Sequence, residues 1–295
     1  MSEARNQHRT EVGAFLQWRF GSRDWQLSLP RGTGNETYYA ESGGKTYFIK
    51  VGAFVERYRV MAELGLTPAV LAAGQLADGA TILVQPRIEG RNPSRQDFQR
   101  HPERFANVIR EVHNSAALKQ VLPPRSSDSY QAVGLETLAD VQRRWAQFRP
   151  QVPAVVAFVD AQIEILKDQL EQLPGGGLVA SHNDICNGNW LVTANEKVYL
   201  VDLETMALDD PALDLGALLW WYYPPEMRAD FLAVAGYENN AQFREKMRIR
   251  MAIHCLSIIL PRENSFDRFN PDSFADLLED FRAVVGGEEN PQGYH

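Results

Sequence analysis

The structural preference of the residues changes along the chain near residue 86, and this change limits the possible folds more than any other feature. Before it, segments rich in aromatic and β-branched residues are separated by Gly-bearing turns such as 31–36 and 42–45, which is typical of strands. Residues 10–20 and 54–64 instead favour helices. We expect strands at 25–29, 37–41, 46–51, 69–73 and 80–85.

Helical segments dominate after a stretch that is punctuated by Gly90, Pro93 and Ser94. Two short strands, 190–193 and 198–201, are expected to interrupt them. We expect helices at 95–118, 134–147, 153–173, 211–222, 225–235, 239–260 and 271–285.

This order of elements predicts two lobes. A small strand-rich lobe followed by a large helical lobe is an α+β pattern. A length of 295 residues agrees with two lobes at the usual size of about 150 residues per domain. We expect a β-rich lobe at 1–85, a hinge at 86–93 and a helical lobe at 94–295.

Composition and charge exclude several classes of protein. The net charge of −8 comes without a basic stripe, so nucleic-acid binding is not expected. No run approaches the ~18 apolar residues of a membrane span, and the polar N-terminus shows no secretory signal. Cys186 and Cys255 are too few for a disulfide framework or a Cys-rich zinc site. We expect a cytoplasmic protein without a membrane partner, and the oligomeric state, monomer or homodimer, stays open.

The densest polar cluster, 181–189, lies just before the two short strands of the helical lobe. Asp184 leads this loop, Asn189 closes it, and the return strand delivers Asp202 at its end, so three oxygen-bearing side chains can converge. Phosphoryl transfer needs such a group, because one carboxylate accepts the proton of the attacking hydroxyl while a second carboxylate and an amide oxygen hold Mg²⁺. A loop rich in Asn and Asp is also typical of turns and caps, so the cluster alone supports both interpretations.

Three segments together resemble the choline kinase and aminoglycoside phosphotransferase family, whose members share the protein-kinase-like fold. They are His182–Asn189 (HNDICNGN), Tyr199–Glu204 (YLVDLE) and Asp210–Leu215 (DPALDL). Their order and spacing are close to the family pattern, and the similarity extends over about two thirds of the chain. The resemblance implies a bilobal fold with a small β-rich N-lobe and a larger, mainly helical C-lobe. Two positions differ from the commoner form, because Asn187 stands in place of Pro and Leu203 in place of Phe or Trp.

The resemblance implies a role for each matching residue of this loop and the strand after it. Asp184 would be the catalytic base, and Asn189 and Asp202 would bind Mg²⁺. His182 would brace the loop, with a purely structural histidine as the alternative. Asp214 would anchor the loop from a helix N-terminus, although an acidic residue there also suits a plain helix start.

The resemblance also implies nucleotide-binding residues in the first lobe, with ATP and Mg²⁺ as cofactors. Lys50 ends the third strand, where the fold places a lysine that binds phosphates. Glu56 on the next helix is its expected partner, and Glu63 is the alternative. Two roles stay open for Glu204, namely support of the site and contact with the substrate. The other expected nucleotide contacts lie in a loop over the phosphates and in the hinge: Gly32, Thr33, Asn35, Gln85 and Arg87.

The acceptor that the resemblance implies is a hydroxyl of a small, cationic amino alcohol such as choline, ethanolamine or a thiamine-like cation. Asn183 is typical of the choline-kinase branch, whereas aminoglycoside enzymes more often carry Gly there. Aromatic faces recognise quaternary ammonium groups, and Trp220, Trp221 and Tyr222 are the candidates. Because successive helical residues point about 100° apart, at most two of 220–223 face one pocket, and packing between helices is the other interpretation.

Other functions remain open. An aminoglycoside phosphotransferase is the nearest, and homoserine, sugar or fructosamine kinases follow the same chemistry. A catalytically silent, nucleotide-binding regulatory protein is less favoured, because the four residues that the transfer needs are all present: Lys50, Asp184, Asn189 and Asp202. A protein kinase is disfavoured, since 203–209 leaves too little chain for an activation segment. Acidic residues available for an aminoglycoside pocket are Glu226, Asp230, Asp267 and Asp272.

Overall fold

Residues 3–30, 36–262 and 269–294 are described by the computed structural model, in which the chain forms two units. The first unit consists of Met1–Asn92 and Gly188–Thr205, and the second of Pro93–Asn187 and Met206–His295. The linear division expected from the sequence differs from these units in one segment. Gly188–Thr205 groups with the first unit because β8 (Trp190–Thr193) pairs with β6 (Gly90–Arg91).

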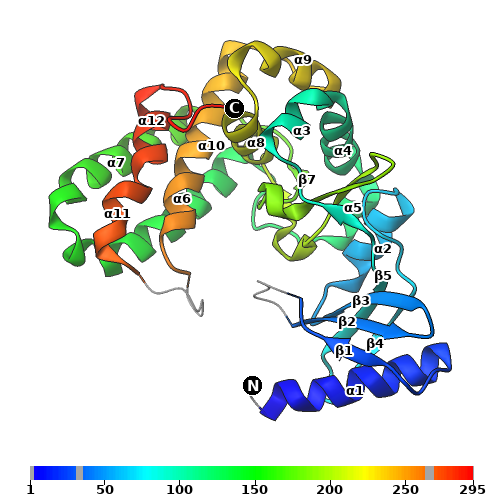
Figure 1. The fold of residues 1–295 in the computed structure, drawn as a ribbon. Helices are drawn as coiled ribbons and strands as arrows, with labels where there is room; N and C mark the ends of the chain where they lie inside the picture. The colour runs from blue at the N-terminus through cyan, green and yellow to red at the C-terminus, as the bar shows by residue number, and fades with distance from the viewer. Residues whose placement is uncertain (1–2, 31–35, 263–268, 295) are drawn as a thin grey trace. The chain divides into compact units, whose positions relative to one another are not determined.

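The first unit is built on a five-stranded antiparallel sheet in the order β1-β2-β3-β5-β4 (Figure 1). Each strand overlaps a segment that the sequence predicts as a strand, which confirms the β-rich character of this lobe. In the central register, Lys50 pairs with Thr37 on one side and Leu83 on the other. The strands are β1 (Gln26–Ser28), β2 (Thr37–Ser42), β3 (Lys45–Val51), β4 (Ala72–Gln75) and β5 (Thr81–Pro86).

Alternation along these strands gives the sheet two chemically different faces. On one face, Tyr38, Ile49 and Val84 are fully buried against Val12 and Leu16 of α1 (Glu3–Phe20), which Figure 1 shows beside the sheet. The opposite face carries the residues one position away in each strand, namely Thr37, Tyr39, Phe48, Lys50 and Gln85. Burial of the apolar face against α1 therefore commits these polar and aromatic side chains to the other side.

Two further parts complete the first unit. The helix α2 (Val55–Glu63) follows β3 directly. A small antiparallel sheet joins β6, β8 and β9 (Val198–Leu200), and the 3₁₀ turns η3 (Asn187–Asn189) and η4 (Leu203–Thr205) flank its strands. Among the described helices of the chain, none is both long and apolar enough to cross a membrane.

The second unit is mainly helical and has one small antiparallel pair of strands, β7 (Val179–Ser181) and β10 (Ala207–Asp209). Figure 1 shows α8 and α6 beside α10. Its helices are α3 (Arg95–Arg100), α4 (Pro102–Asn114), α5 (Ala116–Val121), α6 (Tyr130–Phe148), α7 (Val156–Gln172), α8 (Pro211–Tyr222), α9 (Pro225–Ala235), α10 (Ala241–Ile259), α11 (Pro271–Leu277) and α12 (Glu279–Gly286), with 3₁₀ turns η1 (Arg149–Gln151) and η2 (Pro153–Val155).

The single helix expected at 95–118 is wrong, because the chain forms three helices there. Pro102 lacks a backbone N–H and starts a new helix after the cap at His101. The hydroxyl of Ser115 then accepts from the N–H of Leu118 and caps the third helix. The helix expected at 271–285 likewise divides into two at Leu278. The strands β6, β7 and β10 were not predicted, since two or three residues show no periodicity.

Close packing between α8 and α10 depends on Gly216. A Cβ built on this residue would lie 2.7 Å from the backbone oxygen of Met247 in α10. Gly13 in α1 provides a contrast, because a Cβ there would meet no atom within 4 Å. The two helical glycines therefore separate the steric cost of a methyl group from its effect on helix propensity.

We expect Gly216→Ala to lower the free energy of unfolding by about 1–3 kcal/mol, because the backbone oxygen of Met247 cannot move away without displacing α10. Gly13→Ala should raise that free energy by up to about 1 kcal/mol, since Ala is the better helix former. Urea unfolding of both variants measures the difference. Equal effects of the two substitutions would contradict the packing argument.

The helix α1 is also held by a charged contact. His8 Nδ1 lies 2.8 Å from Glu36 Oε2, and its Nε2 lies 2.8 Å from Asp78 Oδ2. Only the imidazolium form can donate through both nitrogens. The hydrogen bonds to Glu36 and Asp78 therefore raise the pKa of His8 above its usual 6.5.

Because the pKa of His8 is raised on folding, this contact stabilises the protein fully below pH 6.5 and is lost as the pH rises through the raised value. We expect the free energy of unfolding to fall with rising pH in that window, and His8→Gln to remove this part of the pH dependence. Urea unfolding across the window measures it. His101→Gln is the control and should keep the dependence; a His8→Gln variant that also keeps it would refute the contact.

Candidate functional site

The face of the sheet opposite α1 borders a cavity of about 620 Å³ within the first unit. The sheet contributes six residues to its wall, among them Lys50 and Gln85, and the 3₁₀ turn η3 contributes Asn189. Asp202, just after β9, also lines it. Four residues predicted from widely separated parts of the sequence, Lys50, Gln85, Asn189 and Asp202, therefore lie on one cavity, as does Arg87.

Lys50 is the buried charge of this cavity, with 4% of its surface exposed. Its ammonium donates to Asp202 Oδ1 at 2.6 Å and to Tyr58 Oη at 3.1 Å, and it also contacts a carboxylate oxygen of Glu204. Three acceptors thus satisfy the three donors of the ammonium. Such pairing is what allows a lysine to remain charged when buried.

The expected ion pair between Lys50 and Glu56 is wrong. Glu56 is exposed and pairs with Arg59, 2.6 Å away, on the solvent side of α2. Glu63, the alternative, is exposed as well. The helix instead turns Tyr58 towards the lysine, and Glu204 supplies the carboxylate.

Glu204 is fixed by α2 from two sides, and sequence reasoning missed both contacts. Arg57 Nη1 donates to the backbone oxygens of Leu203 and Glu204 at 3.2 and 3.0 Å. The hydroxyl of Tyr58 donates to the Glu204 carboxylate, and burial raises the pKa of Tyr58 so that this proton is retained. Burial also raises the pKa of Glu204, as does its hydrogen bond with Asp202, while Lys50 opposes the rise. The pattern of α2 gave no signal for these contacts, because the partners lie about half the chain away.

Strand pairing brings Asn189 and Asp202 to the same end of the small sheet. Trp190 pairs with Leu200, and just beyond this pair the N–H of Val201 donates to the backbone oxygen of Asn189 at 2.8 Å. Asp202 then adopts a left-handed backbone with φ of 58°. Asp and Asn tolerate this conformation better than other side-chain-bearing residues, and such strain is concentrated at functional sites.

The pair fits a magnesium site chemically. A carboxylate and an amide oxygen are the hard ligands that Mg²⁺ prefers, and Mg²⁺ usually takes its remaining ligands from water and phosphates. Among the described residues, no group of three or more His, Cys, Asp or Glu side chains forms a closed metal cage. Asn189 and Asp202 are thus suited to a metal that arrives with a phosphate ligand.

Asn92, in the expected hinge, holds the segment that carries Asn189. Its side-chain Nδ2 donates to the backbone oxygens of Gly188 and Trp190, at 3.0 and 2.8 Å. Both carbonyls flank Asn189, so one amide group fixes the backbone on either side of the candidate metal ligand. The sequence gave no signal for this role beyond the preference of Asn for irregular segments.

The loop with Asp184 belongs to the second unit and is organised around Asp214. The carboxylate of Asp214 accepts from the backbone N–H groups of His182 and Asn183, at 2.8 and 2.9 Å. Asn183 has a left-handed backbone with φ of 64°, and His182 is fully buried. Asp214 therefore makes the contacts expected of an anchor for this loop, while Asp184 itself is half-buried.

Asp214 is held in turn by a chain of two hydrogen bonds that the sequence did not predict. His113 Nε2 lies 3.2 Å from Asp214 Oδ2, and His113 Nδ1 lies 2.8 Å from the hydroxyl of Tyr237. Burial alone would raise the pKa of Asp214, but the hydrogen bond and charge of His113 and the His182 contacts lower it to about 2. The anchor is thus an ionised carboxylate at every pH at which the protein is expected to work.

The three aromatic candidates point to different surroundings. Trp220 is buried, and its Nε1 donates to the backbone oxygen of Glu288 at 3.4 Å. The hydroxyl of Tyr222 accepts from the N–H of Asn187 at 2.8 Å, which places this ring beneath the loop. Trp221 is half-buried and packs edge-on against the ring of His254, 5.4 Å between centroids. Trp220 therefore follows the packing interpretation of this run.

Some predicted residues lie outside the part of the chain that the structure describes. Gly32, Thr33 and Asn35 of the expected phosphate loop are among them, as is Asp267. Their expected roles stay predictions.

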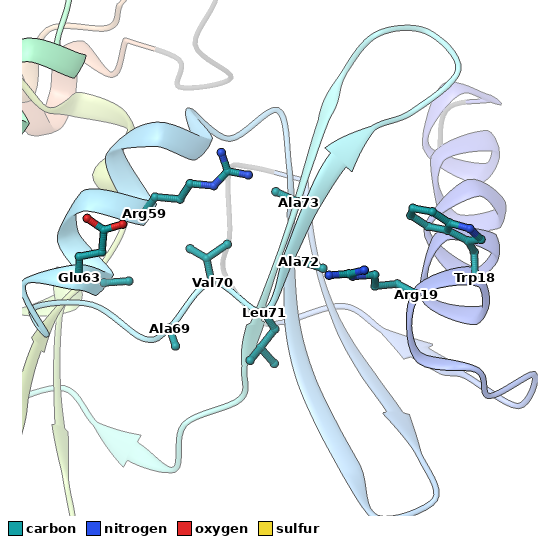
Figure 2. A pocket seen from close by; sticks show the side chains of 10 residues that line it. Trp18, Arg19, Arg59, Glu63, Ala69, Val70, Leu71, Ala72 and Ala73 are labelled. Atoms are coloured by element: carbon teal, nitrogen blue, oxygen red, sulfur yellow. The ribbon is translucent and has the colours of Figure 1, made fainter.

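A second cavity of the first unit, about 660 Å³ in volume, lacks a comparable set of groups. Figure 2 shows Trp18 and Arg19 of α1 on one side of β4, and Arg59 and Glu63 of α2 on the other. Arg59 is engaged by Glu56, and among the described residues that were predicted to carry chemistry, Glu63 alone, the alternative partner of Lys50, lines this cavity. The candidate site is therefore the cavity of Lys50 and Asp202.

A model of the phosphotransferase enzyme family (APH) matches residues 26–248, which is more than half of the chain. The match includes every described residue of the cavity and the loop of Asp184.

Solved structures share the fold. A choline/ethanolamine kinase family protein from Mesorhizobium loti is 22% identical, with a TM-score of 0.67 over 96% of each chain. The phosphotransferase APH(2″)-IIIa, in complex with GDP and kanamycin, is 12% identical, with a TM-score of 0.69 over 95% of this chain and 99% of that chain. A spectinomycin phosphotransferase, in complex with ADP and spectinomycin, is 17% identical, with a TM-score of 0.59 over 94% of this chain and 96% of that chain. These likenesses confirm the expected kinase-like fold.

We expect Asp214→Asn to lower the free energy of unfolding by about 3 kcal/mol, because it leaves His113 and two backbone N–H groups without their buried carboxylate. Chemical unfolding at neutral pH measures this. Asp230→Asn, on an exposed face of α9, is the control and should change it by less than about 0.5 kcal/mol. Equal free energies of unfolding of the two variants would refute the role of Asp214 as the anchor of the loop.

Proposed function

The chain belongs to the phosphotransferase enzyme family, and we propose that it transfers the γ-phosphoryl group of a nucleoside triphosphate to a hydroxyl of a small, cationic amino alcohol. The observation that carries the proposal is the cavity on which a buried lysine, a carboxylate and an amide oxygen lie together: Lys50, Asp202 and Asn189. Positioning and charge neutralisation are the main means by which proteins accelerate phosphoryl transfer, and these three groups supply both.

The nucleotide phosphates would meet Lys50, whose ammonium is already fixed by Tyr58 and Glu204. Asn189 and Asp202 would hold Mg²⁺, which supplies charge neutralisation of the phosphates when bound. Arg57 and Asn92 keep the backbone of these segments in place. In this proposal the chain's own residues would position the phosphates before any acceptor binds.

Asp184 would accept the proton of the acceptor hydroxyl as the general base. Its loop is fixed through the backbone N–H groups of His182 and Asn183, which Asp214 binds. We assign Asp214 and His113 as positioning residues, because they act on the loop and not on the reacting atoms.

Three observations favour an amino alcohol as the acceptor. Asn183, next to Asp184, is the residue typical of the choline-kinase branch, and a structural neighbour is a choline/ethanolamine kinase family protein. Trp221 is the aromatic residue of its run that keeps a partly open surface. An aminoglycoside is the second candidate, since two neighbours were solved with kanamycin and spectinomycin.

We expect Asp184→Ala and Asp202→Ala each to lower kcat by about 10²–10⁴-fold, because each removes a carboxylate that acts in the transfer step. The measurement is transfer from γ-labelled ATP or GTP to choline, ethanolamine, thiamine, kanamycin or spectinomycin. Asp168→Ala, exposed on α7, is the control and should turn over like the unmodified protein. Thermal unfolding of each variant shows that the fold is retained.

The outcomes separate the candidate functions. Transfer to kanamycin or spectinomycin without transfer to an amino alcohol would identify an aminoglycoside enzyme. Nucleotide-dependent thermal stabilisation without transfer to any alcohol would favour the silent regulatory protein. Turnover of Asp184→Ala or Asp202→Ala at the unmodified rate would refute the mechanism.

A further inference from the structure

The second cavity of the first unit lies at an open edge of the five-stranded sheet. The strand β4 ends the strand order and, among the described strands, pairs with β5 alone. Figure 2 shows this edge strand between Trp18 and Arg19 of α1 and Arg59 and Glu63 of α2. The strand and both helices line the hollow of about 660 Å³, so the hollow follows the free edge of the sheet.

This edge lacks the charged side chains that usually prevent pairing with another chain. Exposed edges are normally protected by charges, by proline within the strand, by a covering helix or loop, or by a short strand. No residue from 64 to 77 is charged, and β4 itself reads Ala-Ala-Gly-Gln. A strand of four residues offers few hydrogen bonds to a bare peptide. A stable partner therefore has to contact the two flanking helices as well as the strand.

Trp18 stands in the open beside the hollow. Its exposed fraction of 76% is the largest among the large hydrophobic side chains of the described chain. Tryptophan is enriched among the residues that carry the binding energy of protein interfaces. The hollow next to it has apolar side chains in its wall, including Ala62, Val70 and Leu71. A surface with both a projecting ring and an apolar hollow has the shape to receive a second copy of itself.

The charges of α2 at this hollow are also self-complementary. Arg59 and Glu63 lie one helical turn apart and are both exposed on the hollow. Glu63 makes no hydrogen bond or ion pair with any residue of the described chain. Arg59 meets Glu56 through Nη1 alone, which leaves most of its five N–H donors available to a partner. A neighbour that presents a carboxylate to Arg59 and a guanidinium to Glu63 fits both groups.

The two helices flank the strand on opposite faces of the sheet. The helix α1 covers the face of Tyr38, whereas α2 brings Tyr58 to Lys50 on the other face. A two-fold axis perpendicular to the sheet sets β4 antiparallel to its counterpart and keeps each helix beside its own counterpart. The axis joins the two sheets edge to edge, so all three elements that line the hollow are used at once.

The same axis pairs the side chains reciprocally. It reverses α2 relative to its counterpart, so an axis level with the turn between the two charges sets Arg59 of each copy against Glu63 of the other. On the opposite face, it brings Trp18 of one copy towards Trp18 and Arg19 of the other, where ring packing and cation–π contacts become available. Glu63 thereby gains the partner that its own chain does not supply.

We propose that the hollow between α1, β4 and α2 is a homodimer interface, in which the β4 edges of two copies of this chain pair antiparallel across a two-fold axis. The occupant of each hollow is the same surface of the second copy. A single peptide strand would pair with β4 but would leave Trp18, Arg59 and Glu63 without their reciprocal partners. The inference goes beyond the proposed function and does not depend on it, because no residue of this hollow lines the cavity of Lys50.

Sedimentation equilibrium of the full-length protein measures the association. At micromolar concentrations the unmodified protein should form a dimer and no larger species, because a two-fold interface closes on itself. Trp18→Glu places a charge within the interface and should raise the dissociation constant of the dimer by at least about 10-fold. Ile165→Glu, which changes an exposed apolar residue of α7 in the second unit, is the matched control and should leave that constant unchanged.

Charge reversal tests the two-fold arrangement itself. Glu63→Arg sets arginine against arginine at both symmetry-related contacts and should raise the dissociation constant by at least about 5-fold. Arg59→Glu should do the same, because it opposes two carboxylates. The double variant restores opposite charges across the axis and should return the constant to within about 3-fold of the unmodified value. Glu164→Arg, on an exposed face of α7, is the control for a change of net charge.

Amide hydrogen exchange adds a readout of the strand pairing. The amides of β4 should exchange more slowly as the protein concentration rises into the dimeric range, whereas those of the exposed turn at 77–79 should not change. Thermal unfolding shows whether each variant is folded.

Three results would overturn the inference. The first is an unmodified protein that stays monomeric, which would leave this edge to a different partner. The second is a dimer that a folded Trp18→Glu variant forms as tightly as the unmodified protein, because its interface would then lie elsewhere. The third is a double variant that associates no more tightly than Glu63→Arg or Arg59→Glu alone, which would exclude the reciprocal contact between the two charges.

Discussion

Burial of the Lys50 ammonium is the constraint on which the rest of the first unit depends. A charged group removed from water is tolerated only when it is paired and its donors are satisfied. The sheet places Lys50 opposite the apolar face covered by α1, and the acceptors then have to come from elsewhere: Asp202 and Glu204 follow β9, and Tyr58 comes from α2. One buried charge thus draws together a central strand, a helix and a segment that returns to this unit after a long excursion of the chain.

Two carboxylates contact this lysine. One ammonium faces two carboxylates, and the two are not equivalent. Glu204 is the more buried of them, and its pKa is raised by burial, whereas the side chain of Asp202 is 43% exposed and lines the cavity. Glu204 is therefore the carboxylate that pairs with Lys50 in the interior. Asp202 is the carboxylate with surface available for a cation. The same pairing that makes the buried lysine tolerable leaves a site suited to a divalent metal that carries phosphates.

The alternation of side chains along the strands, together with the Gly-bearing turns between them, made the strands of the first unit predictable. The strand 190–193 is observed as Trp190–Thr193, and the place of Lys50 at the end of β3 follows from the pattern of its strand. The partner of Lys50 was not predictable in the same way. The apolar spacing of α2 shows that the helix has a buried side, but Arg57 and Tyr58 are buried because their partners, Leu203 and Glu204, are brought to them by the fold. Contacts between residues about 145 positions apart leave no local pattern, and neither do strands as short as β6, β7 and β10.

The irregular segments that carry the chemistry are fixed by a common device. An irregular backbone has N–H and C=O groups that no helix or sheet pairs, and each needs a partner. Asp214 supplies a carboxylate to two N–H groups of the loop before Asp184, while Asn92 supplies an amide to two carbonyls on either side of Asn189. Each side chain has the hydrogen-bonding character that its partners require, because a carboxylate can only accept and the Nδ2 of an amide donates. In both places the loop is held through its backbone by a side chain from outside it. Substitution of Asp184 or Asn189 removes none of these four hydrogen bonds, because the donors and acceptors belong to Asp214, Asn92 and the backbone of neighbouring residues.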